Sequence, residues 1–245
     1  MKDRTRYIVQ GIGVAVVAAM LVAALIWGKQ ETPNTAVCRS IEYTIADEDE
    51  RQYVSPRELN IVLDQAGQYP VGKAMNTISL QAIERTIRAH SMVRTVECYL
   101  TPRHEVRVRL TQRVPLLRVV TASDTYLIDE DRKVMPAKAV VKDSVLIVRG
   151  NIGAQLASGA IADFAEWLQD NRYWREQVRY VYVQSPQMVY LYLRGGQPRV
   201  VMGNMNEYKR KLVKLRTFFE EGTEALQDKH YTELDVRFRG QVIGR

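Results

Sequence analysis

The feature of the sequence that most constrains the fold is a long apolar run near the N-terminus, over residues 7–27. Within it only Gln10, Gly11 and Gly13 fall outside the apolar residue types. At about 1.5 Å per residue, a helix of this length spans roughly 31 Å, which matches the hydrocarbon core of a bilayer, about 30 Å thick. A cleaved signal peptide has a shorter apolar core, about 7 to 15 residues, that ends in a small-x-small site. The run therefore predicts an uncleaved transmembrane helix.

Basic residues flank this predicted helix unevenly. Lys2, Arg4 and Arg6 precede it, whereas only Lys29 follows it closely. By the positive-inside rule, the N-terminus is cytoplasmic and the chain from about residue 30 onward lies on the outer side of the membrane.

Small residues recur at every fourth position along the predicted helix. Such a stripe lets a second transmembrane helix approach closely, although a span rich in alanine can also produce it by chance. The candidate residues for this packing face are Gly11, Ala15, Ala19 and Ala23.

Composition and motifs exclude several functional classes. The chain is 46% hydrophobic, which is ample for a packed core. Its formal net charge is +7, but the first 30 residues supply three of these charges, so the remainder is only mildly basic and does not favour nucleic acid. No CxxC pair, zinc-type histidine motif, GxSxG or SxxK is present. We therefore expect no enzyme and no metal or cofactor site. The sequence leaves open whether Cys38 and Cys98 pair, because geometry decides this.

After a tail, the predicted membrane span and a linker over residues 1–36, we expect a first outer domain over residues 37–114. A strand-like run covers 37–45, and Ser55, Pro56 and Glu58 form a helix start with a capping box. Gly67 ends this helix, and a second one begins at Ser79. Residues 93–100 and 106–110 alternate as strands do. The order strand, helix, helix, strand, strand predicts a small α+β unit.

A second, β-rich domain with flanking helices is expected over residues 115–245. Short strands are predicted at 126–128, 134–136, 178–183, 188–193, 200–202 and 233–242, and helices at 160–169 and 206–221. Four tyrosines alternate along the hairpin of 178–193. We interpret them as one side of a packed sheet, with a binding platform as the alternative.

Taken together, these segments resemble the FtsQ/DivIB family of bacterial cell-division proteins, which combine one membrane span, a POTRA domain and a β domain. The resemblance covers the whole chain and rests on the order of several short motifs. These lie at 53–59, 78–84, 93, 112–115, 126–129, 135–136, 203, 211–215 and 234–238.

The resemblance implies a non-enzymatic scaffold of the division machinery in the bacterial inner membrane at the division site, with its main body in the periplasm. Such a scaffold binds the single-pass partners FtsB and FtsL outside the membrane and helps to assemble and regulate septal peptidoglycan synthesis. It implies no small-molecule substrate. The competing interpretation is a membrane-anchored POTRA-containing component of polypeptide transport or assembly, and a third is an anchored hydrolase with a site that the sequence hides.

In the family, an FtsB segment adds as a further strand beside the last strand of the β domain. The matching positions here are Arg237, Phe238, Gly240 and Val242. The resemblance implies that Arg237 pairs with an acidic partner side chain and that Phe238 is an apolar anchor. The alternative for Phe238 is packing inside the core.

The sequence departs from the family pattern in two places. The first POTRA strand lacks the glycine that often ends it. Arg132 stands where the acidic-tipped hairpin commonly has glycine. If this position has a positive φ, arginine costs about 1 kcal/mol there.

Overall fold

The computed structural model describes residues 36–47, 49, 52–137, 145–196, 198–221 and 231–245, together with Met20. The predicted membrane span and its stripe of small residues lie outside these ranges, apart from Met20, which is helical and exposed. Among the described residues, no helix is both long and apolar enough to cross a membrane.

The first domain follows the predicted order of elements. It comprises β1 (Ser40–Ile45), α2 (Pro56–Gln65), a short 3-10 helix (Met75–Thr77), α3 (Leu80–Arg88), β2 (Val93–Leu100) and β3 (Glu105–Gln112). The strand order is β1-β3-β2, with β1 parallel and β2 antiparallel to β3.

Capping side chains fix the two helices of this domain where the sequence predicts. The Ser55 hydroxyl accepts a hydrogen bond from the Glu58 amide, and the Ser79 hydroxyl accepts one from the Ala82 amide. Gly67 has a φ of 67° just after α2. The helices bury Leu59, Leu63, Ile83 and Ile87 against Val106, Val108 and Leu110 of β3.

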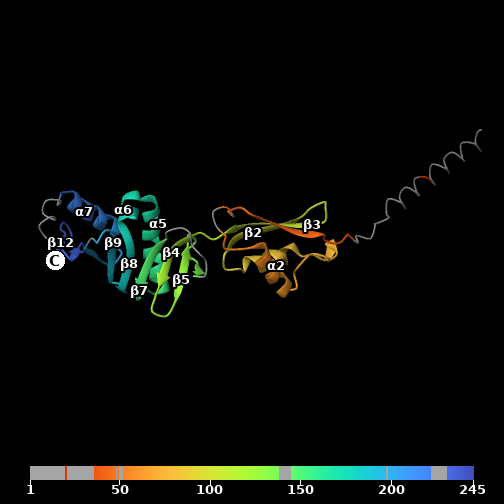
Figure 1. Cartoon of the computed structure of the whole chain (residues 1–245), viewed down its shortest axis with the longest axis horizontal. Coiled ribbons are helices and arrows are strands. Elements are labelled where there is room, and N and C mark those ends of the chain that lie inside the picture. The colour runs from red at the N-terminus through yellow and green to blue at the C-terminus, as the bar shows by residue number, and fades with distance from the viewer. Residues whose placement is uncertain are drawn as a thin grey trace, which may run out of the picture.

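The second domain is built on a nine-stranded sheet with the order β12-β11-β10-β9-β8-β7-β4-β5-β6 (Figure 1). Its strands are β4 (Pro115–Val120), β5 (Thr125–Asp129), β6 (Val134–Pro136), β7 (Leu146–Gly150), β8 (Val178–Ser185), β9 (Met188–Leu193), β10 (Arg199–Gly203), β11 (Glu233–Asp235) and β12 (Ile243–Gly244). Between β7 and β8 lie α4 (Ala154–Leu156), a π turn (Ala157–Ile161), α5 (Ala162–Asp170) and α6 (Arg172–Gln177), and α7 (Tyr208–Glu221) connects β10 to β11.

The helices cover one face of this sheet. Both β7–β8 and β10–β11 are parallel pairs whose crossovers progress in the same direction, so the right-handed rule places α5 and α7 on the same face. The ring of Tyr208 in α7 contacts Phe164 and Trp167 of α5, with centroids 5.3 and 5.6 Å apart. The alternating tyrosines of β8 and β9 lie on the opposite face, because Val181, Val183, Val189 and Leu191 point into the core.

Two sequence predictions in this domain are wrong in extent. The helix predicted at 160–169 begins earlier, at Ala154, and passes through the π turn, where Gly159 has non-helical dihedral angles. The last strand, predicted over 233–242, stops at Asp235 and resumes only at Ile243.

The hairpin of β5 and β6 joins the two domains. Its tip pairs Asp129 with Arg113 at 2.7 Å and Asp131 with Arg94 at 2.8 Å. Leu127 and Met135 of the hairpin pack into the same apolar cluster as the core of the first domain.

Arg132 at the tip of this hairpin has a φ of 64°, so the condition for backbone strain is met. Its guanidinium bonds to Asp163 at 2.9 Å and to Glu166 at 2.5 Å, both in α5. Glycine would adopt this backbone more easily but could not make these contacts. The departure from the family pattern thus ties the hairpin to a helix.

A glycine at the end of β7 allows the close approach of β8. Gly150 has a φ of 108°, and a Cβ there would overlap the carbonyl oxygen of Val183. We predict that Gly150→Ala lowers the free energy of unfolding by at least about 3 kcal/mol. Gly195→Ala is the matched control, since Gly195 has a φ of 73° but open space around it, and it should cost only about 1 kcal/mol. Equal losses in denaturant unfolding would show that the close approach is unimportant.

Candidate partner-binding edge

The four residues predicted for partner binding lie at one end of the large sheet, but not on one strand. Arg237, Phe238, Gly240 and Val242 belong to the segment that connects β11 to β12. Phe238 is 45% exposed, which excludes the alternative that it packs in the core. Val242 is half-buried against the domain core. Gly240 has a φ of 77°, so the chain turns here instead of continuing as a strand.

A buried carboxylate explains why the strand stops. Asp235 is fully buried at the end of β11. One of its oxygens accepts a bond from the Arg237 amide at 3.1 Å, and its other oxygen bonds to the Arg237 guanidinium at 2.6 Å. The Arg237 amide therefore turns to a side chain and not to a neighbouring strand.

Burial alone would raise the pKa of Asp235. Hydrogen bonds from the side chain and the amide of Arg237, together with the charges of Arg237 and Arg245, outweigh burial and hold this pKa below its usual range.

Two lysines of α7 hold the same region from the helix side. Lys211 is buried, and its ammonium group donates to the carbonyl oxygens of Met202 and Asn204 at 2.9 and 2.8 Å. The ammonium group of Lys214 donates to the carbonyl oxygens of Val236, at 3.0 Å, and Phe238. Desolvation lowers the pKa of both lysines. The carbonyl groups at the ends of β10 and β11 thus accept hydrogen bonds from the side chains of a helix.

Strand β12 forms the free edge of the described sheet. Arg245 and Glu233 exchange both of their backbone hydrogen bonds, at 2.9 and 3.1 Å, so they form a hydrogen-bonded antiparallel pair. Because such pairs alternate along a ladder, the N–H and C=O groups of Gly244 turn away from β11. A side chain at Gly244 would overlap the ring of Tyr231. The outward backbone groups are therefore available to a further strand.

The outer edge of β2 in the first domain is blocked, in contrast. The Cys98 amide donates to a carboxylate oxygen of Glu84 at 2.8 Å, and the Val96 carbonyl accepts from Arg88 at 3.2 Å. Glu84 and Arg88 also pair with each other at 3.7 Å. Side chains of α3 thus occupy backbone groups that an added strand would need.

Neither cysteine forms a disulfide in the structure. Burial, together with the charge of Glu84, raises the pKa of the Cys98 thiol to about 12. Cys98 is therefore a poor nucleophile near neutral pH.

The sheet face opposite the helices carries the four tyrosines, and an arginine connects them to this edge. Tyr180 and Tyr192 stack with ring centroids 4.4 Å apart, and Arg149 lies over Tyr180 at 5.3 Å. Arg199 lies over Tyr190 at 5.2 Å and pairs with Glu233 of β11 at 2.7 Å. The tyrosines are half-buried or exposed, as rings with wet hydroxyl groups prefer.

Sequence reasoning missed the roles of Asp235, Lys211 and Lys214. An acidic residue between Leu234 and Val236 was the available signal for a buried ion pair. The carbonyl partners of the lysines come from distant parts of the chain, so no local pattern reveals them. Among the described residues, no group of three or more acidic, histidine or cysteine side chains could hold a metal ion.

Comparison with known families agrees with this architecture. The family described as FtsQ/DivIB, C-terminal related matches residues 114–245, and the POTRA-like domain family matches residues 36–111. No curated protein matches the chain. Since the first match covers more than half of the sequence, the chain belongs to the FtsQ/DivIB family, whose members are non-enzymatic cell-division proteins. The family match indicates a role in cell division.

The buried ion pair of Asp235 gives a pH prediction. Its pKa is lower in the folded than in the unfolded chain, so its stabilising contribution is full above about pH 4 and is lost as the pH falls through the folded pKa. Asp235→Asn should therefore lower the free energy of unfolding by about 2 kcal/mol at pH 7. The difference from the unaltered chain should shrink as the pH falls through the folded pKa of Asp235, because the carboxyl group then becomes neutral, as the asparagine amide is. Denaturant unfolding at pH 7, 5, 3 and 2 measures it, and a difference independent of pH would contradict the ion pair.

Proposed function

We propose that this chain is a non-enzymatic scaffold of the cell-division machinery that binds FtsB-like and FtsL-like membrane proteins through its C-terminal edge. The partner segment adds as a strand beside β12. The observation that carries the proposal is the outward direction of the backbone groups of Gly244 at a free edge of the described sheet. Main-chain bonds would supply affinity, and neighbouring side chains would supply selectivity.

Phe238 and Arg237 take different parts in this binding. The exposed ring of Phe238 is an apolar anchor beside the edge. The guanidinium of Arg237 lies 5.7 Å from this ring and is already bonded to Asp235, so it positions the segment. Its outer side can also face an acidic side chain of the partner, because the Arg237 side chain is 36% exposed. Gly240 makes the turn that presents Phe238.

The family role and the sequence together suggest where this happens. An N-terminal membrane span would place both domains in the periplasm, beside the outer segments of single-pass partners. Assembly at the division site would then help to place and regulate septal peptidoglycan synthesis. The family match favours this function over polypeptide transport, which needs a channel or motor as a partner.

Replacing the apolar anchor with a positively charged side chain tests the proposal. The full chain, purified in a neutral detergent, should capture the outer segments of an FtsB-like protein and an FtsL-like protein, and Phe238→Lys should weaken capture at least tenfold. Because the Phe238 ring is exposed, the thermal unfolding of this variant should change little.

Val134→Lys is the matched control. Val134 is a 59% exposed apolar residue on β6, at the opposite edge of the same sheet, and its replacement should leave capture unchanged. Weakened capture by Val134→Lys alone would move the site to the β6 edge. Absence of capture by the unaltered chain would refute these partners.

A further inference from the structure

A pocket of about 510 Å³ opens at another part of the second domain. It lies where β4, β7 and β8 begin, beside α5, and β9 and β10 separate these strands from the C-terminal edge. Its apolar floor is formed by Leu116, Leu146, Ala165, Leu168 and Val178. Volumes of about 300 to 1,000 Å³ with a mostly apolar lining are typical of sites for small molecules.

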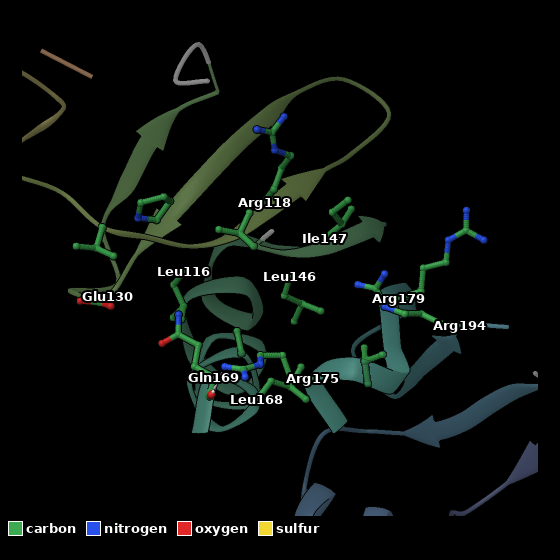
Figure 2. Close-up of a pocket in the computed structure, with 15 residues that line it drawn as sticks. Leu116, Arg118, Glu130, Leu146, Ile147, Leu168, Gln169, Arg175, Arg179 and Arg194 are labelled. Atoms are coloured by element: carbon green, nitrogen blue, oxygen red, sulfur yellow. Dashed lines mark hydrogen bonds between the residues drawn. The ribbon is translucent and has the colours of Figure 1, made fainter. Parts of the chain in front are cut away.

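Arginines surround this floor. Arg175 follows the buried Trp174 in α6, and its guanidinium donates to the carbonyl oxygen of Gln169 at the end of α5, at 3.0 Å (Figure 2). Arg179 and Arg194 lie next to each other in the same view, since each follows one residue of the paired Val178 and Leu193. Neither of these two guanidinium groups has an ion pair with any described residue.

Negative charge at the pocket is scarce. Glu130 is the one carboxylate among the lining residues, and it faces Arg94 of the first domain at 3.8 Å. A further lining arginine, Arg118, points to the other side of its strand in Figure 2. Three arginines thus line a pocket whose one carboxylate among the lining residues already has a basic neighbour.

We propose that this pocket binds a small organic anion that carries carboxylate or phosphate groups beside an apolar part. Guanidinium groups suit both kinds of anion because they donate two parallel hydrogen bonds. The floor suits the apolar part, since a ligand there would displace water from the partly exposed Leu146 beside the buried Leu116 and Leu168. This site is separate from the strand edge and does not depend on the function proposed above.

Isothermal titration of the full chain in a neutral detergent tests the proposal. The probes are phenyl phosphate, phenylsuccinate and the uncharged benzyl alcohol. At least one of the two anions should bind, and benzyl alcohol should not. The double variant Arg179→Ala, Arg194→Ala should weaken anion binding at least tenfold, because it removes two charged donors. Preference for phenyl phosphate would indicate a phosphate ester as the natural ligand, and preference for phenylsuccinate a carboxylic acid.

Arg172→Ala, in α6 beside the pocket residue Arg175, is the control. Arg172 is exposed, pairs with Glu176 at 2.9 Å and does not line the pocket, so this variant should bind the anions unchanged. Thermal unfolding of each variant, and its capture of the FtsB-like segment, should match the unaltered chain. The proposal is overturned if neither anion binds, if benzyl alcohol binds equally well, or if the double variant binds as tightly as Arg172→Ala.

Discussion

The ammonium groups of Lys211 and Lys214 secure the end of the second domain that we propose as the docking edge. Both donate to main-chain carbonyl groups at the ends of β10 and β11. Such bonds offset the cost of burying a charge, which the lowered pKa of each lysine reflects. Helix α7 must therefore pack directly over β10 and β11. This position brings the tyrosine and phenylalanine rings of its apolar face against the core of the domain.

The segment after β11 depends on the same arrangement. Lys214 holds the carbonyl groups of Val236 and Phe238, while Asp235 holds both the amide and the guanidinium of Arg237. The Arg237 side chain packs against Gly203, where a Cβ would lie 2.9 Å from its Cδ. These contacts keep Phe238 at the surface and shorten the last strand to Ile243–Gly244. The edge of the described sheet is therefore a two-residue strand beside an exposed aromatic ring.

Local patterns in the sequence predicted most of the elements. Ser55 caps the first helix of the first domain as expected, and the second helix starts at Ser79 as expected. The alternation of Val106, Val108 and Leu110 marks a buried strand face. Arg132 has the positive φ on which the expected backbone cost was conditional. These successes share a cause, since each signal lies within a few residues of the feature that it determines.

The last strand shows why the rest could not be predicted. Residues 233–238 alternate as a strand would. However, the Arg237 amide donates to the buried carboxylate of Asp235, and Lys214, more than 20 residues earlier in the chain, donates to the Val236 carbonyl. The pocket is another case, because Arg179 and Arg194 come to line the same pocket only through the pairing of β8 with β9. Long-range side-chain contacts of this kind leave no periodic trace in the sequence.

Hydrogen exchange at individual amides, measured on the full chain with and without the outer segment of an FtsB-like protein, tests the docking edge most directly. Strand addition at β12 predicts that the amide of Gly244, which turns away from β11, and the amide of Val242 just before the strand exchange much more slowly when the partner is bound. Amides of β6 and of the blocked β2 edge should exchange as before. Protection at β6 or β2, with Val242 and Gly244 unchanged, would contradict a docking site at the C-terminal edge.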